Sequence, residues 1–255
     1  MINETADAAQ TGEEPASVPQ NRVFSMFFAV LDDEKKADAI FFVGVNAEKK
    51  CASVVLIPAN TGVTEVGVTY RLGEMYAARG MAAVERVLGD QIGMTPTYYM
   101  ALTRDGLSNW VDFIGGVPFN VPQNMDGFDS AGNRRIHLQA GQQKLNGDQV
   151  AQFLAFRDYG GSVTARDDAL LSFARSFCTF FLQSPNFSVA KNIFYNVAHH
   201  ADTNMEEKDL TRVGGVLFSF NEHTPNYVRI PGATDAAGYY SISDSRAKPL
   251  FELYQ

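Results

Sequence analysis

The sequence predicts an α/β fold, with a central mixed β-sheet that is covered by helices on both faces. Three apolar runs near the start of the chain have the composition of buried strands, and after them stretches with helical spacing alternate with further apolar runs. Beyond residue 22 neither a long linker nor an internal repeat interrupts this alternation. We therefore expect one α/β/α domain over residues 23–255, with a core over residues 23–183 and a C-terminal extension over residues 184–255.

The first 22 residues are polar and acidic, and they lack the apolar centre of a signal peptide. This composition is typical of a disordered leader or linker, such as the stalk left by a trimmed membrane anchor.

Three β-rich runs open the domain, and we expect strands at residues 23–31, 39–46 and 52–57. Because these runs are apolar almost throughout, they indicate a sheet centre that is buried on both faces. The charged turn at residues 32–36 separates the first two strands.

A helix is predicted over residues 72–88, with a shared apolar face formed by Met75, Ala78, Ala82, Val84 and Leu88. A strand at residues 98–102 and a helix at residues 105–114 follow, and Gly115 and Gly116 end that helix. The remaining predicted elements are strands at 117–121, 216–220 and 227–230, helices at 148–156, 166–182, 188–200, 206–213 and 245–254, and loops at 122–135 and 231–238.

The composition excludes several classes of function. A formal net charge of −8 argues against nucleic-acid binding, so any anion site must be a local cluster of arginine or lysine. No phosphate-binding glycine loop, dinucleotide fingerprint or nucleophile elbow is present. Cys51 and Cys178 lie in apolar runs and are best interpreted as buried thiols, although a disulfide between them stays open.

Four stretches, in this order, resemble motifs of the LytR-CpsA-Psr family, the cell envelope-related transcriptional attenuator domain. Residues 36–38 (KAD) lie where the family carries Arg-Ser-Asp, and residues 56–61 (LIPANT) lie where it carries Ser-Ile-Pro-Arg-Asp-Thr. Residues 110–117 (WVDFIGGV) are similar to its Leu-Val-Asp-x-Leu-Gly-Gly-Val, and residues 141–149 (GQQKLNGDQ) to its Gly-x-x-x-Leu-Asn-Gly-x-x. The resemblance covers residues 23–183 and is most specific in the last two motifs.

The resemblance implies an extracytoplasmic protein of the bacterial cell envelope, anchored to the membrane in its full-length form. The family transfers a phosphorylated glycopolymer from a polyprenyl pyrophosphate carrier to an acceptor in the cell wall, such as peptidoglycan. A divalent metal and a cluster of arginines hold the pyrophosphate, and the lipid lies in an apolar tunnel between sheet and helices.

By this resemblance Asp38 is a catalytic residue that binds Mg²⁺ or Mn²⁺, with Asp32 or Asp33 as the second carboxylate. The alternative is that residues 32–36 form only a solvated acidic turn. Arg157 and Arg166 fall on catalytic, phosphate-binding arginines, and Lys36 keeps a charge where the family has arginine. The residues expected to line the lipid tunnel, or else to belong to an ordinary core, are Phe41, Phe153, Phe173 and Phe177.

The sequence departs from the family pattern where charge is expected. Ala59 and Ala155 replace arginines, Asn60 replaces an aspartate, and Ala169 and Leu170 stand where an Arg-Gln pair is expected. Since phosphoryl transfer depends on positioning and charge neutralisation, such losses predict reduced or altered activity. Arg71, Arg79 or Arg104 could supply charge from another direction. The sequence thus leaves open an active phosphotransferase or pyrophosphatase, a non-catalytic module that binds polyprenyl phosphate, and an envelope scaffold.

Overall fold

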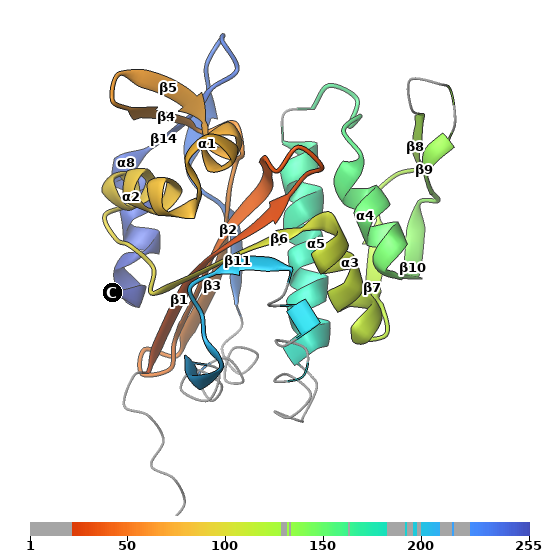
Figure 1. The fold of residues 1–255 in the computed structure, drawn as a ribbon, viewed down its shortest axis with the longest axis horizontal. Coiled ribbons are helices and arrows are strands. Elements are labelled where there is room, and N and C mark those ends of the chain that lie inside the picture. The colour runs from red at the N-terminus through yellow and green to blue at the C-terminus, as the bar shows by residue number, and fades with distance from the viewer. Residues whose placement is uncertain are drawn as a thin grey trace, which may run out of the picture.

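A six-stranded mixed sheet forms the centre of the protein in a computed structural model (Figure 1). The structure describes residues 22–128, 132, 134–162, 164–182, 192, 196–197, 200–209, 216 and 225–255. The leader expected over residues 1–22 lies outside these residues except for Arg22. The predicted helix at 188–200 lies mostly outside them, as does the helix at 206–213 beyond Asp209.

The three predicted N-terminal strands occupy the middle of the sheet, where nearly all of their residues are buried. They pair antiparallel with one another, and a parallel strand flanks them on each side. The order is β11 (Ala201–Thr203), β6 (Tyr98–Thr103), β1 (Val23–Leu31), β2 (Ala37–Asn46), β3 (Cys51–Ile57) and β12 (Asn226–Arg229). Both edge strands therefore come from the expected C-terminal extension.

One face of the sheet is covered by α1 (Leu72–Arg79), α2 (Met81–Ile92) and the C-terminal turns, which comprise α8 (Asp244–Ala247), η2 (Lys248–Leu250) and η3 (Glu252–Tyr254). The Phe251 ring meets the Phe42 ring edge-on, with 4.9 Å between centroids. The Tyr254 hydroxyl contacts Ser53 Oγ at 2.7 Å. These contacts fix the chain end on the sheet.

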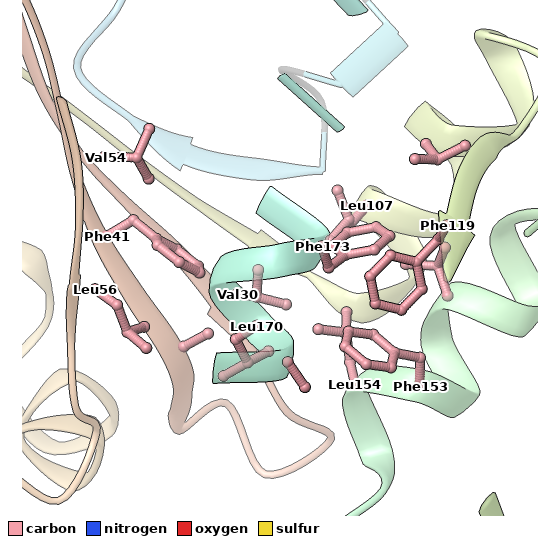
Figure 2. Close-up of a cluster of buried hydrophobic side chains, with 14 of the residues drawn as sticks. Val30, Phe41, Val54, Leu56, Leu107, Phe119, Phe153, Leu154, Leu170 and Phe173 are labelled. Carbon is pink, nitrogen blue, oxygen red and sulfur yellow. The ribbon is translucent and has the colours of Figure 1, made fainter. Parts of the chain in front are cut away.

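The opposite face carries α3 (Arg104–Phe113), α4 (Gly147–Ala155) and α5 (Ala165–Leu182), so helices cover both faces as predicted. In Figure 1, α5 stands between the sheet and a layer formed by α4 with the paired strands β7 (Val117–Val121) and β10 (Gly141–Leu145). Figure 2 shows Phe173 of α5 facing Phe119 and Phe153 across this layer. The ring centroids of Phe173 lie 5.4 Å from Phe119 and 5.3 Å from Phe153.

The two most specific sequence motifs meet at the junction of α3 and α4. Asp112 Oδ1 accepts the backbone N–H of Gly147 at 2.7 Å. A Cβ at position 147 would lie 2.3 Å from the backbone oxygen of Ser108, so the close approach of the two helices requires glycine there. Asn146 caps α4 in a capping box with Gln149. These motif residues build the fold.

The predicted helix over residues 72–88 is wrong in its continuity, because Gly80 has a φ of 75° and separates α1 from α2. The break resets the buried face of the second helix, so Ala78 and Ala82 are exposed while Met75, Val84 and Leu88 are buried.

Short polar hairpins were missed because their strands are too exposed to show apolar alternation. The predicted loop 122–135 contains β8 (Met125–Phe128) and the start of β9 (Arg134–Leu138), and the predicted loop 231–238 contains β13 (Gly232–Thr234), which pairs with β14 (Tyr240–Ile242). The pair β4 (Gly62–Glu65) and β5 (Val68–Arg71) was also missed. The terminal helix is a series of short turns, and Val216, expected in a strand, is helical.

Both cysteines are free, and they lie on opposite faces of the sheet, so they do not pair. Among the described helices none combines the length and the apolar composition needed to cross a membrane.

Candidate functional site

Three arginine side chains converge on the buried carboxylate of Asp38 at one end of the sheet. Arg157 Nη2 lies 2.5 Å and Arg166 Nη2 lies 3.1 Å from Asp38 Oδ1. Arg104 Nη2 lies 3.3 Å from Asp38 Oδ2. We call these four residues the Asp38 cluster.

A β-bulge positions the carboxylate. The pairing of β1 with β2 skips Asp38, because Val30 faces Ala39 and Leu31 faces Ala37. Strict alternation along β2 would place Asp38 on the face covered by α1 and α2. The bulge instead turns its side chain toward the arginines of α3 and α5, as bulges beside functional sites commonly do.

The arginines come from three separate segments that end at this edge of the sheet. Arg104 directly follows β6 and is the first residue of α3, and Arg166 is the second residue of α5. Arg157 lies in the connection after α4, which is held in place by the buried Tyr159. The Tyr159 ring packs edge-on against the Phe156 ring, with 5.3 Å between the centroids.

The Asp38 cluster carries a positive charge in a partly buried setting. Three guanidinium groups face the carboxylates of Asp38 and Asp33, which leaves one net positive charge. The Asp38 side chain is 7% exposed, whereas that of Arg157 is 49% exposed. Burial lowers the pKa of Arg166, and the carboxylate of Asp38 opposes this shift. Arginine stays protonated under these conditions, so the cluster can attract an anion.

Two predicted site residues lie apart from the Asp38 cluster. Lys36 Nζ pairs with Glu34 Oε2 at 2.6 Å on the exposed turn between β1 and β2. Asp32 Oδ1 accepts the backbone N–H groups of Glu34 and Lys36, so this carboxylate organises the turn. Asp33 is the acidic residue linked to the cluster, since Arg104 Nη1 lies 3.1 Å from its Oδ2.

The donor set for a divalent metal is small. In the described part of the chain, no group of three or more His, Cys, Asp or Glu side chains could hold a metal ion. Asp38 offers one buried carboxylate, and Mg²⁺ is commonly bound by one or two carboxylates while water and substrate phosphate supply its other ligands. The residues present therefore do not form a complete metal site by themselves. They fit a metal ion whose other ligands are phosphate oxygens and water.

The positions that depart from the family pattern explain where charge is missing. Ala59 lies just past the end of β3, level with Asp38, and both Ala59 and Ala37 approach Gly73. An arginine at position 59 would therefore extend from the α1 side of the sheet, next to the strand end that carries Asp38. Ala169 and Leu170 face the core and are 4% and 3% exposed, so they do not reach the cluster.

Of the three arginines considered as replacements, the structure places only Arg104 at Asp38. Arg71 lies over the Tyr239 ring, 5.1 Å from its centroid, and Arg79 lies 4.0 Å from Glu65. No sequence signal distinguishes Arg104 from the other two, because its role depends on β6 ending beside the β1–β2 turn.

The expected tunnel residues lie on both sides of α5: Phe41 belongs to the sheet, whereas Phe153 and Phe173 meet where α4 packs against α5. Phe41, Phe153 and Phe173 are buried, and the last two are closed in by ring contacts. Phe177 keeps part of its surface accessible. The central strands add side chains that sequence analysis missed, because Met26, Phe28 and Val43 also remain partly accessible on this face.

A family profile and a characterised relative match nearly the whole chain. The sequence profile of the LytR_cpsA_psr family matches residues 18–253. A relative, the polyisoprenyl-teichoic acid–peptidoglycan teichoic acid transferase TagU of Bacillus mycoides, is 24% identical over 273 residues, which cover 96% of this chain and 82% of that protein.

Two solved structures share the fold. The crystal structure of TagV from B. subtilis has a TM-score of 0.76 at 16% identity and covers 92% of this chain and 98% of its own. The structure of TagT bound to LIIa-WTA has a TM-score of 0.71 at 17% identity and covers 96% of this chain and 93% of its own.

Proposed function

The chain belongs to the LytR-CpsA-Psr family, and on that premise we propose that it binds a polyprenyl pyrophosphate-linked glycopolymer and transfers the glycopolymer with one phosphate to the bacterial cell wall. The observation that carries this proposal is the convergence of Arg104, Arg157 and Arg166 on Asp38 beside an apolar layer. The name of the relative TagU, a teichoic acid transferase acting on peptidoglycan, supports this class of substrate and acceptor.

The Asp38 cluster is suited to a pyrophosphate. The planar guanidinium group binds two phosphate oxygens at once, and hydrogen bonds to charged groups contribute about 1.5–3 kcal/mol each. Arg157 is half-exposed and so can approach an arriving ligand, while Arg166 is held deeper by Asp38 and by the backbone oxygen of Leu154. In this arrangement Arg166 orients the pyrophosphate and Arg157 closes over it.

The apolar layer is suited to a polyprenyl chain. Met26 and Phe28 belong to a central strand, yet they are partly accessible on the face that α3 and α5 cover, while Phe27 and Ala29 on the opposite face are fully buried. Accessible apolar surface in the middle of a sheet is expected where sheet and helix leave space for a ligand. We propose that the lipid lies along Met26, Phe28, Val43 and Phe177.

We propose that Mg²⁺ or Mn²⁺ is required and that Asp38 holds it together with the pyrophosphate. A divalent cation bound there neutralises charge on the phosphate oxygens. Asp32 is a poor second ligand because its Oδ1 accepts two backbone N–H groups, and Asp33 is better placed.

The reaction follows from this arrangement. A hydroxyl oxygen of the acceptor attacks the phosphorus that carries the glycopolymer, and the bond from this phosphorus to the bridging oxygen breaks. Polyprenyl phosphate leaves with that oxygen, and the proton of the hydroxyl is released. The arginines stabilise the charge that spreads over the phosphate oxygens in the transition state.

A non-catalytic module that binds polyprenyl phosphate is the second candidate. It is favoured by the alanines at positions 59 and 155, which remove two charges that the family pattern places near the pyrophosphate. Such a module would bind the same ligand without turnover. For either function we propose an extracytoplasmic location at the cell envelope, with the full-length protein anchored to the membrane.

The only tryptophan of the chain provides the test. Trp110 contacts the rings of Phe177 and Phe181 at centroid distances of 5.1 and 5.3 Å, so its fluorescence should change when lipid enters the apolar layer. We would titrate a short polyprenyl pyrophosphate into the wild type and into an Arg157→Ala/Arg166→Ala double variant, with and without Mg²⁺.

Binding by the wild type and at least tenfold weaker binding by the double variant would support the phosphate site. Equal binding by both proteins would contradict it. Release of polyprenyl phosphate with an acceptor and Mg²⁺ or Mn²⁺ then identifies a transferase, and binding without release identifies the non-catalytic module.

A further inference from the structure

Arg104 has a position that the four family motifs do not include. It follows β6, which runs parallel to β1, and the pair Leu31–Thr103 brings both strands to an end at the same edge. Its guanidinium group therefore reaches the β1–β2 turn and joins Asp33 to Asp38. The Arg104 side chain is only 13% exposed.

The electrostatic setting of Arg104 combines a helix end with several acidic side chains. Arg104 is the first residue of α3, and helix N-termini carry a partial positive charge that disfavours cations. Arg166 has the same problem as the second residue of α5. Asp105 in the first turn of α3, and Asp167 and Asp168 in that of α5, offset the charge of these helix ends. Asp33 and Asp38 pair with the guanidinium groups themselves.

The Arg104 side chain also has an unused donor. Its Nε is buried and has no hydrogen-bond partner among the described residues, while Nη1 and Nη2 each bind one carboxylate. Leaving a buried donor unpaired is costly, so this group is poised to donate to a ligand oxygen.

Two neighbouring strand ends flank Asp38 in the sheet, and of their residues Arg104 carries a positive charge while Ala59 does not. On the β3 side stands Ala59, where the family pattern has an arginine. On the β1 and β6 side stands Arg104. The guanidinium group that reaches the carboxylate of Asp38 from a neighbouring strand end is therefore that of Arg104, on the β6 side.

We propose that Arg104 is a phosphate-binding residue of this chain and stands in for the guanidinium group that Ala59 does not provide. This inference rests on the proposed function, because it assigns a further residue to the same pyrophosphate site. It also determines the direction of approach: the ligand oxygens bind between the N-termini of α3 and α5.

The test is binding of inorganic pyrophosphate, measured by calorimetry on the whole chain. The variants are Arg104→Gln, Arg104→Lys, Arg166→Gln and the combination Arg104→Gln/Ala59→Arg. We expect Arg104→Gln to weaken binding about 10- to 100-fold, the loss of one charged hydrogen bond of about 1.5–3 kcal/mol. Arg104→Lys keeps the charge but loses the planar two-donor geometry, so its affinity should lie between those of the wild type and Arg104→Gln.

The combined variant separates a binding role from a structural one. If Arg104 binds phosphate, Ala59→Arg restores most of the affinity by supplying the guanidinium group from the β3 side. Failure to restore it would overturn the exchange between positions 59 and 104. If Arg104→Gln fails to fold, Arg104→Lys and its Ala59→Arg partner carry the same comparison.

The outcomes distinguish this inference from the proposed function. Absence of binding to the wild type overturns both. Loss of binding in Arg166→Gln, together with unchanged binding in Arg104→Gln, overturns the role of Arg104 and leaves the proposed function standing.

Discussion

Arg104 and Arg166 each lie in the first turn of a helix, and they bind opposite oxygens of a single buried carboxylate, that of Asp38. The two helices belong to separate parts of the chain, because α3 follows β6 whereas α5 follows α4. Asp38 is therefore a counter-charge that both arginines share, in addition to the acidic residues in the first turns of the two helices.

Replacement of the Asp38 carboxylate should destabilise the fold and increase the stabilisation that an added anion provides. In Asp38→Asn the arginines lose their buried counter-charge, and we expect the free energy of unfolding to fall by about 3 kcal/mol. Sulfate should then raise the melting temperature of the variant more than that of the wild type, because an anion that binds only the folded state stabilises it.

Asp33→Asn is the matched control, since Asp33 also contacts Arg104 but its side chain is 87% exposed. We expect it to change the unfolding free energy by less than about 1 kcal/mol. Equal losses in the two variants would show that burial of Asp38 does not matter.

The junction of α3 and α4 should affect stability separately from ligand binding. Asp112→Ala removes the acceptor for the Gly147 N–H and should cost about 1–2 kcal/mol, because the carboxylate is itself partly exposed. Asp112→Asn keeps an acceptor and should lose less. Calorimetric pyrophosphate binding is expected to be unchanged in both, and a large loss of affinity would place Asp112 in the site.

Stability should decline in alkaline solution. Burial raises the pKa of Tyr76, Tyr227 and Tyr254 above the ordinary tyrosine value, and it raises the pKa of Cys178 to about 12. Below the pKa values of the unfolded chain, the folded and unfolded states both keep these protons, so the free energy of unfolding retains its full value. As pH rises above about 8.5 for the thiol and about 10 for the phenols, the unfolded chain releases them first and unfolding becomes easier.

Urea unfolding between neutral pH and pH 11 measures this decline. Tyr254→Phe removes one phenol and should show a shallower decline than the wild type, after a loss of about 1 kcal/mol at neutral pH from the missing Ser53 contact. An identical pH dependence in the variant would contradict a role for Tyr254.

The two thiols should differ in reactivity and in their response to lipid. Cys178 lies in the apolar layer of α5, and its raised pKa keeps it protonated near pH 8, so alkylation by iodoacetamide should be slow. Polyprenyl phosphate should slow it further. Cys51, on the other face of the sheet, is the internal control whose labelling rate should not respond to the lipid. Equal protection of both cysteines would indicate a general stabilisation and not occupancy of the layer.

The sequence predicted those parts of the fold that depend on long apolar patterns. The central strands and helices α3, α4 and α5 have enough buried residues to show a period. The apolar pattern failed at Gly80, where a positive φ angle divides the predicted single helix into α1 and α2. It also failed in hairpins such as β8–β9, whose faces are mostly exposed.

The Asp38 cluster was predictable only in part. Asp38, Arg157 and Arg166 were identified through the family motifs, whereas Lys36 and Asp32 turned out to serve the exposed turn. The bulge that turns Asp38 and the strand end that delivers Arg104 depend on pairing between distant segments. A sequence pattern does not encode which of several arginines such pairing brings together.

The hydrogen bond between Asp112 and Gly147 joins two family motifs that lie outside the Asp38 cluster. The motif residues by which a member of this family is recognised hold two helices together, while the residues of the Asp38 cluster are carried on other segments. A substitution within the Asp38 cluster therefore leaves the contact between α3 and α4 intact. Members of the family can therefore share the fold without sharing a reaction. The activity of each member must be established at its own charged residues.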